Sequence, residues 1–484
     1  MLSAMKGTPR AIQLLVLSFL CPTEFSLFLG TFRLPPHRLV LIVLLPLALH
    51  RIMTRRDIHW RTFDTAVLTS AIWAMYVFAH HLGNDAGIKY GGSLALESLG
   101  AFLIARAFVR DAETFRATCA TLLAAVVCAG LIAMPETFLG KLYVHDTLAK
   151  LTGYVHPTGV EKRLGLTRAY GTFDHPIHYG TFAASVLAIT WFTQTKATQQ
   201  RVKAAIIAVI TFLGLSSAPM LCLALQGGMI AWEKVTRTVT NRVTMLVGAI
   251  VALYFAASMV MTRSPFAFVA TGFTLDPWTG YYRLQIWEHG LNNVGANPLM
   301  GIGLNDWARP EWMVSDTVDA FWLVLMMRQG LPALFLLLLS ITLMIRAVNA
   351  RGMAPQTHPG VRNYGKGWMM GLVALSLIAC TVHYWNVLHS YFFFILGLGG
   401  WLADPGPQSL KVGTQVAGVR ASAPIEVRAP PGTQPEPQPP GDGLSPPPHG
   451  PPPAQPPGLP VGGLAELGRT FVVALPPGHP ARPS

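Results

Sequence analysis

A series of apolar windows, each about as long as a membrane-crossing helix, is the feature that most constrains this chain. A helix needs about 20 mostly apolar residues to cross the hydrocarbon core of a bilayer. Twelve such windows can be placed along the sequence: 11–30, 37–53, 63–82, 92–109, 115–134, 176–193, 203–216, 218–232, 243–262, 318–345, 367–382 and 385–402. The sequence therefore predicts an all-α integral membrane protein with about 12 transmembrane helices. Eleven or thirteen spans are also compatible, because two windows are short and a break at Pro219 alone separates them.

The composition supports a membrane protein and argues against a nucleic-acid partner. Only 12% of the residues are charged, compared with about 25% in average proteins. The formal net charge is +13, but the basic residues form short clusters between the apolar windows. We therefore attribute this charge to membrane topology. The cysteines lie within apolar segments and lack metal-like spacing, so we expect small buried hydrophobes: Cys21, Cys119, Cys128, Cys222 and Cys380.

The basic clusters predict the orientation of the chain. Short loops rich in Lys and Arg stay on the cytoplasmic side of a membrane. Arg33 and Arg38 depart weakly from the pattern, but the main clusters follow every second window: Arg51/Arg55/Arg56/Arg61, Arg106/Arg110/Arg116, Lys196/Arg201/Lys203, Lys234/Arg237/Arg242 and Arg346/Arg351/Arg362/Lys366. We therefore expect a multi-pass protein of the bacterial inner membrane with both termini in the cytoplasm. The long loops 135–175 and 263–317 then face the periplasm.

The two ends of the sequence differ from the apolar body. Lys6 and Arg10 precede an apolar run as in a signal peptide, but no small-residue cleavage site follows, so we expect a retained first helix. From 403 to 484 the composition changes to Pro, Gly, Gln and Ala. Such a tail buries too little apolar surface to fold, and we expect a disordered cytoplasmic linker after a membrane domain at 1–402.

The polar stretch 263–330 lies between two strongly apolar spans and is the main candidate for a site. Its segment 281–293 is compatible with a helix, and Arg283 and Trp287 lie one turn apart on one face. Tyr282 and Trp287 also suit a membrane interface. Two interpretations stay open: a substrate site, or an interfacial helix whose arginine meets lipid phosphate.

The earlier loop contributes Arg168, His175 and His178. The histidines are three residues apart with Pro176 between them, and no further ligand is clustered nearby, so a zinc site is not expected. The outward loops also lack a D-x-D pair for a divalent cation. We therefore predict no metal and no cofactor, and expect arginines to supply the positive charge.

Ionisable residues within or beside the apolar windows are further candidates. Arg328 lies about 15 Å into its span at helical rise and needs a carboxylate or carbonyl partner, such as Glu97. Asp64 is near a span end, where we expect it to reach water. Asp316 and Asp319 precede the span at 318–345 and are interpreted first as helix caps, with a general base as the second interpretation.

Several stretches together resemble the O-antigen ligase and O-antigen polymerase family of bacterial membrane glycosyltransferases. They occur in the family's order over about residues 10–402: TFRLPPHRLVLIVLLP, GGSLALESLGAFLIARAFVRD, RAYGTFDHPIHYG, LGLSSAPML and YYRLQIWEHG…NPLMGIGLNDW…VDAFWLVLMMRQGLPAL. The resemblance implies metal-independent transfer of a glycan from undecaprenyl diphosphate to a sugar hydroxyl at the periplasmic face. The acceptor is lipid A-core in ligases and another lipid-linked glycan in polymerases.

The resemblance also implies roles for individual residues. By position, Arg168 and Arg283 match the family's two diphosphate-binding arginines. Many ligases carry a His-Asn pair where this sequence has Asp319-Ala320, so Asp319 is the candidate base, with Asp316 or His289 as alternatives. This departure favours a polymerase or a related exopolysaccharide enzyme over a ligase. The candidate substrate-binding residues are Tyr282, Trp287, His175, His178 and Arg328.

Two other classes of function stay open. Twelve spans and cations within the membrane would also suit a lipid-linked glycan flippase or another transporter, although no internal repeat is visible in the sequence. An assembly protein that recruits partners through the proline-rich tail is the third class.

Overall fold

The structure, a computed structural model, describes residues 5–30, 32–153, 159–239, 242–261 and 277–404. The chain divides into two units, Met1–Thr414 and Gln415–Ser484, and the fold described below belongs to the first. The predicted tail from residue 405 onward and the start of the predicted loop at 263–276 lie outside the described residues.

Helices make up most of the described chain, and several of them fit a membrane. Six segments are long and apolar enough to cross one: α2 Pro36–Thr54, α3 Thr62–Leu82, Asn84–Phe108, α6 Ala112–Leu139, α15 Phe321–Met353 and Asn386–Ala403. The segment Asn84–Phe108 comprises α4 Asn84–Ala95, a π-helical turn η2 Leu96–Gly100, and α5 Ala101–Phe108. The segment Asn386–Ala403 comprises α17 Asn386–Leu398 and α18 Gly400–Ala403. These segments fit the predicted all-α membrane protein, and the count of 12 spans stays a prediction.

The other predicted windows are also helical where the structure describes them, and most of their helices are shorter, broken or less apolar than these six segments. They are α1 Arg10–Phe19, α8 Pro176–Ser185, α9 Leu187–Thr193, α10 Ala197–Phe212, α11 Ser217–Val235, α12 Arg242–Val260 and α16 Pro359–Ile378. Two further helices lie in the predicted outward loops: α7 Tyr143–Thr152 and α14 Pro277–Ala296. Short elements complete the described chain: η1 Thr23–Phe25, the antiparallel pair β1 Leu27–Leu29 and β2 Phe32–Leu34, and the antiparallel pair β3 Lys162–Arg163 and β4 Leu166–Thr167.

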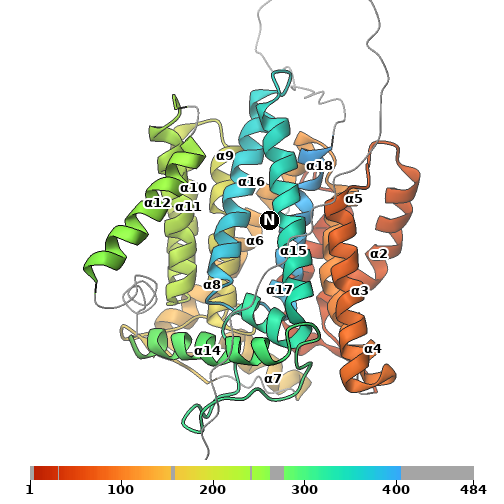
Figure 1. Cartoon of the computed structure of the whole chain (residues 1–484). Coiled ribbons are helices and arrows are strands. Elements are labelled where there is room, and N and C mark those ends of the chain that lie inside the picture. The colour runs from red at the N-terminus through yellow and green to blue at the C-terminus, as the bar shows by residue number, and fades with distance from the viewer. Residues whose placement is uncertain (1–4, 31, 154–158, 240–241, 262–276, 405–484) are drawn as a thin grey trace, which may run out of the picture. The chain divides into compact units, whose positions relative to one another are not determined.

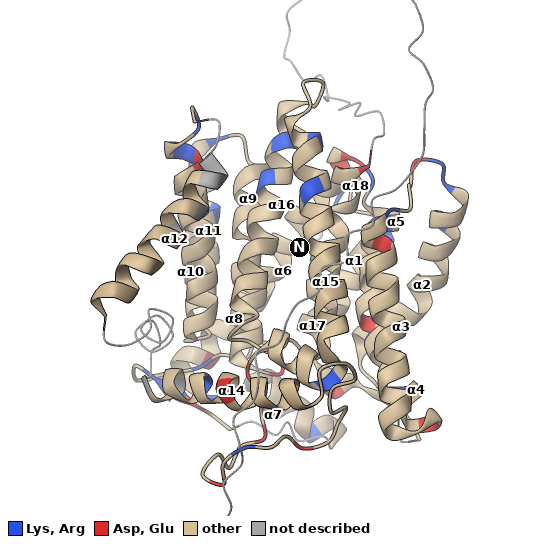
Figure 2. Cartoon of the chain, viewed as in Figure 1, with Lys and Arg blue, Asp and Glu red and all other residues tan. Residues whose placement is uncertain are grey.

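The long helices run side by side, and α14 lies crosswise near the ends of α15 and α8 (Figure 1). Charged residues gather mainly at the two ends of the helices, and the middle of the helices is mostly uncharged (Figure 2). At the centre, 94% of the residues in the segment containing α17 and α18 are buried inside the protein. α17 packs on α5 and α16, and its N-terminal end leads directly into the candidate site.

Helix α15 is kinked at Gly330, where φ is 75° and ψ is 175°. Pro332 follows and cannot donate the hydrogen bond that the Arg328 carbonyl would receive in a regular helix. The segment 297–303 compensates, because Ile302 N donates to Met327 O at 2.7 Å and Gly303 N donates to Arg328 O at 3.2 Å. Leu331 N in turn donates to the Pro298 carbonyl at 2.8 Å. The loop and the kink therefore form one hydrogen-bonded unit that holds Arg328.

A buried charge cluster ties α3, α5 and the end of α18 together. Arg106 is 1% exposed, and it donates to both Asp64 carboxylate oxygens at 2.9 Å. It also donates to Asp404 Oδ2 and to the His59 carbonyl, each at 2.9 Å. The expectation that Asp64 reaches water is therefore wrong, because the aspartate is buried as the partner of Arg106. This pairing was not predictable from the sequence, because its members come from distant segments.

Candidate functional site

Three neighbouring cavities lie beside the α16–α17 connection, and His383 and Trp385 of this connection line all three. The Arg168 cavity measures about 190 Å³ and contains Arg168, Arg283 and Asp319 in its wall. The middle cavity measures about 310 Å³ and is also lined by Asp319. The Glu97 cavity measures about 460 Å³ and lies between α4, α15 and α17. Segments that are far apart in the sequence therefore meet around two shared side chains.

Arg168 follows β4 on a loop whose backbone is hydrogen-bonded to Glu136 of α6. Glu136 Oε2 accepts hydrogen bonds from the backbone N–H groups of Tyr170 at 3.0 Å and of Gly171 at 2.8 Å. The N–H of Ala169 donates to the Leu213 carbonyl at 3.1 Å. Glu136 was not among the predicted site residues, because it lies just beyond the predicted window 115–134, at the start of the predicted loop 135–175.

The guanidinium of Arg168 has donors without acceptors. The side chain is 3% exposed, and its Nη1 is ion-paired with Glu161 at the surface. Its Nε and Nη2 are buried and lack a hydrogen-bond partner among the described residues. A buried donor without a partner costs about 1–3 kcal/mol, more when charged. An oxygen-rich anionic ligand would remove this cost.

Arg283 faces the same cavity from α14. Its buried Nε also lacks a partner within the described part of the chain. Burial lowers the pKa of Arg283, while the charge of Asp319 raises it and that of Arg168 lowers it. For Asp319, burial raises the pKa and Arg283 lowers it, leaving the pKa above its ordinary value. The two side chains interact electrostatically, yet no ion pair within 4 Å joins them among the described contacts.

The predicted cap roles of Asp316 and Asp319 are wrong. Helix α15 begins at Phe321, its N-cap is Ala320, and no side chain caps it. The first N–H of α15 donates instead to the Val382 carbonyl at 3.0 Å. Asp319 lines the Arg168 cavity and the middle cavity, and Asp316 lines the middle cavity only. The alternative base His289 lines none of the three.

The two predicted histidines lie beside the site in different roles. His175 lines the Arg168 cavity and caps α8, where its Nδ1 accepts from Ile177 N at 3.1 Å. His178 is buried; its Nε2 is bonded to the His383 carbonyl at 3.0 Å, and its ring lies 3.7 Å from that of Trp385. Burial, with nearby His178, His389 and Arg328, lowers the pKa of His383 to about 3. His383 is therefore neutral near pH 7.

Tyr282 and Trp287 do not line the cavities. Trp287 donates from its indole nitrogen to the Cys380 carbonyl at 2.9 Å and so fastens α14 to the end of α16. The Tyr282 ring lies 6.3 Å from that of Trp312. Both positions indicate packing of α14, whereas the sequence analysis predicted substrate binding for both residues. Trp385, which was not predicted, is the aromatic side chain shared by all three cavities.

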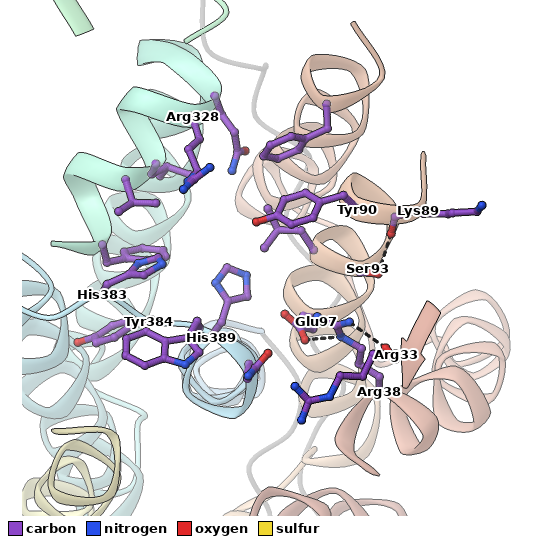
Figure 3. A pocket seen from close by; sticks show the side chains of 18 of the residues that line it. Arg33, Arg38, Lys89, Tyr90, Ser93, Glu97, Arg328, His383, Tyr384 and His389 are labelled. Atoms are coloured by element: carbon purple, nitrogen blue, oxygen red, sulfur yellow. Dashed lines mark hydrogen bonds and ion pairs between the residues drawn. The ribbon is translucent and has the colours of Figure 1, made fainter. Parts of the chain in front are cut away.

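Arg328 and Glu97 line the same cavity but do not pair with each other (Figure 3). Glu97 accepts from His37 at 3.0 Å and from Arg38 Nε at 2.6 Å. The partner of Arg328 is a backbone carbonyl, because its Nη1 donates to Gly303 O at 3.1 Å. The expected choice of Glu97 as partner is therefore wrong, and the hydrogen-bonded loop at the α15 kink is the reason.

No group of three or more His, Cys, Asp or Glu side chains is placed to hold a metal ion within the described ranges. The Arg168 cavity instead presents three arginines, Arg163, Arg168 and Arg283, and two carboxylates, Asp319 and Glu161, of which Glu161 pairs with Arg168. Such a set can hold an anion of the diphosphate type and can accept a proton beside it.

Compared with known proteins, the chain matches no protein-family model and no curated protein. The functional assignment therefore depends on the chemistry of the site itself.

Proposed function

We propose that this chain is a membrane glycosyltransferase that moves a glycan from an undecaprenyl diphosphate carrier to a sugar hydroxyl, at the periplasmic face of a bacterial inner membrane. One observation carries the proposal. Arg168 and Arg283 present buried N–H donors without partners among the described residues, and both line a cavity that Asp319 also lines. The two cations suit a diphosphate, and the carboxylate suits an attacking hydroxyl.

The arginines serve the leaving group in this proposal. Within the part of the chain that the structure describes, Arg168 Nε and Nη2 and Arg283 Nε lack acceptors. Guanidinium groups bind phosphate oxygens through paired hydrogen bonds. As the bond between the sugar and the diphosphate breaks, its electron pair and the negative charge move onto the diphosphate. Fixed cations in a buried site therefore stabilise the transition state, in which this charge develops, more than they stabilise the bound substrate.

Asp319 serves the acceptor. The hydroxyl oxygen forms the new bond to the anomeric carbon, and its proton passes to the Asp319 carboxylate. Burial raises the pKa of this carboxyl group, with Arg283 opposing the shift, so its basicity is higher than that of an ordinary aspartate. Asp316 is the remaining alternative base, because it lines the neighbouring middle cavity.

The test is a transfer reaction with the full chain, purified in lipid. The donor is an undecaprenyl-diphosphate-linked oligosaccharide, EDTA is present, and lipid A-core is either added or omitted. Mass spectrometry should detect glycan transfer together with released undecaprenyl diphosphate. A requirement for lipid A-core indicates a ligase, and transfer between donor molecules indicates a polymerase.

Variants complete this test. Arg283→Ala should abolish transfer and leave membrane insertion intact, and Arg283→Lys should keep part of the activity because it retains charge without the paired donors. Arg346→Ala is the matched control, since this arginine is exposed on α15. An intact donor with every acceptor, or normal turnover in Arg283→Ala, would overturn the proposal in favour of a transporter.

A further inference from the structure

The Glu97 cavity is the largest of the three, and the transfer chemistry described above does not use it. Tyr90, Ser93 and Glu97 form one wall from α4 and η2, and Arg328 reaches it from α15 on the other side (Figure 3). His389 of α17 lies between the two walls. The volume of about 460 Å³ is in the range of small-molecule sites in proteins.

The lining of this cavity carries excess positive charge. Arg33, Arg38 and Arg328 line it, and Glu97 is the one acidic residue in its described lining. Glu97 is already bonded to His37 and Arg38, so it does not neutralise Arg328. Among the described contacts, Arg328 has one hydrogen-bond acceptor, the neutral Gly303 carbonyl. Most donors of this guanidinium are therefore available to a ligand.

A second polar group supports a ligand in the same place. His389 is 6% exposed, and its Nε2 is buried without a hydrogen-bond partner among the residues that the structure describes. The ring points into the space between α15 and η2 (Figure 3). Buried polar atoms are bonded in most proteins, so an unmet one that lines a cavity indicates a missing partner.

The frame around these groups is fixed. Glu97 lies in the π-helical turn η2, a local geometry that is frequent at functional sites. Arg328 is held at the α15 kink by hydrogen bonds from Ile302 N and Gly303 N. Rigid placement of this kind lowers the entropy lost on binding.

We propose that the Glu97 cavity binds the acceptor substrate, a saccharide whose carboxylate or phosphate contacts Arg328 and one of whose hydroxyl groups donates to His389 Nε2. This inference rests on the proposed function, because a transferase needs a second substrate. His383 and Trp385 line both this cavity and the Arg168 cavity. An acceptor held in the Glu97 cavity can therefore direct a hydroxyl past these side chains toward Asp319.

The test measures binding to the full chain in lipid nanodiscs by microscale thermophoresis. Three saccharide probes are compared: trigalacturonate with carboxylates, glucose 6-phosphate with a phosphate, and neutral maltotriose. Farnesyl diphosphate is the probe for the Arg168 cavity. We expect a charged saccharide to bind and maltotriose not to bind, and the stronger of the two charged probes identifies the acidic group.

Arg328→Gln should weaken binding of the charged saccharide about ten- to hundredfold, the range for a hydrogen bond to a charged group. Arg328→Lys should restore part of it, and His389→Gln should weaken it by a smaller factor. Arg346→Gln, an exposed arginine on the same helix, should have no effect. Arg168→Gln should lose farnesyl diphosphate and keep the saccharide.

Equal binding of maltotriose, no binding of any charged saccharide, or an unchanged affinity in Arg328→Gln would overturn the acceptor site. Its failure is distinguishable from that of the proposed function. Binding of farnesyl diphosphate that depends on Arg168, without saccharide binding, removes only the acceptor site. Loss of diphosphate binding, with saccharide binding intact, removes the donor site.

Discussion

Two buried arginines, Arg106 and Arg168, have nearly the same burial and differ in their partners. Arg106 is 1% exposed and Arg168 is 3% exposed. Each guanidinium nitrogen of Arg106 donates to a protein oxygen, from Asp64, Asp404 or His59. Arg168 has an ion pair at Nη1 only, and its Nε and Nη2 have no partner in the described chain.

The difference separates structural cations from binding cations. A buried charge with a full set of partners is stable within the fold, and removal of one member leaves the others uncompensated. A buried charge with unmet donors lowers the stability of the unliganded protein. A ligand that accepts hydrogen bonds from these donors removes this cost, which contributes favourably to the free energy of binding. Burial alone therefore does not identify a site, whereas unmet hydrogen-bonding capacity in a cavity does.

The largest expected effect is on the satisfied cluster. Arg106→Gln removes the cation between Asp64 and Asp404 and should destabilise the protein by about 3–5 kcal/mol. Thermal unfolding in detergent measures this change. Lys89→Gln is the control, because the Lys89–Asp85 pair is exposed and should contribute about 0–1 kcal/mol. Equal stability of the Arg106 variant and the control would contradict the structural role.

Substitution of Arg168 should give the opposite result for stability. Arg168→Met removes a buried charge with unmet donors, so the unliganded protein should be as stable as wild type or more stable. Glycan transfer should fall about 100- to 1000-fold, as when a preorganised electrostatic group is removed from an active site. Thermal unfolding and transfer assays on the same preparation measure both quantities. A large loss of stability would show that Arg168, like Arg106, has a structural role, which would contradict the difference between the two arginines.

The smallest expected effect concerns Asp319 and pH. Burial raises the pKa of this carboxyl group and the charge of Arg283 lowers it, with a net upward shift. A base must be deprotonated, so kcat/KM should rise as pH increases through a pKa above the ordinary aspartate value of about 3.9. Arg283→Lys keeps the positive charge. The acidic limb of its pH profile should therefore have the same apparent pKa, with a lower kcat/KM.

Asp319→Asn is the matched variant for this pH measurement. It should lose most of the activity together with the acidic limb, because an amide does not accept the proton. A limb of the same shape in Asp319→Asn would assign the base to another residue, with Asp316 of the middle cavity as the next candidate.

The helical nature of the chain was predictable from hydropathy, because apolar windows of membrane length have few alternatives to a helix. Their internal breaks were not predictable. The window 176–193 forms two helices, α8 and α9, and the window 92–109 includes the π-helical turn η2. These details depend on tertiary packing, which hydropathy does not report.

The candidate site was predictable only in part. Arg168, Arg283 and Asp319 were selected from the sequence, and the structure places them around one cavity. His383 and Trp385 were missed, because their importance arises only where three cavities meet. The partner of Arg328 was assigned wrongly, because a carbonyl presented by a loop carries no side-chain signal in a sequence.

The close packing at the α15 kink limits how this protein can be redesigned. A side chain at Gly330 would place its Cβ 1.9 Å from the Leu299 carbonyl oxygen, and one at Gly301 would lie 2.4 Å from the Met327 carbonyl oxygen. Because both contacts are with backbone atoms, rotamer changes cannot relieve them. Directed evolution of acceptor preference should therefore yield substitutions among the cavity side chains, while libraries that vary 297–303 or 330 should return mostly inactive clones.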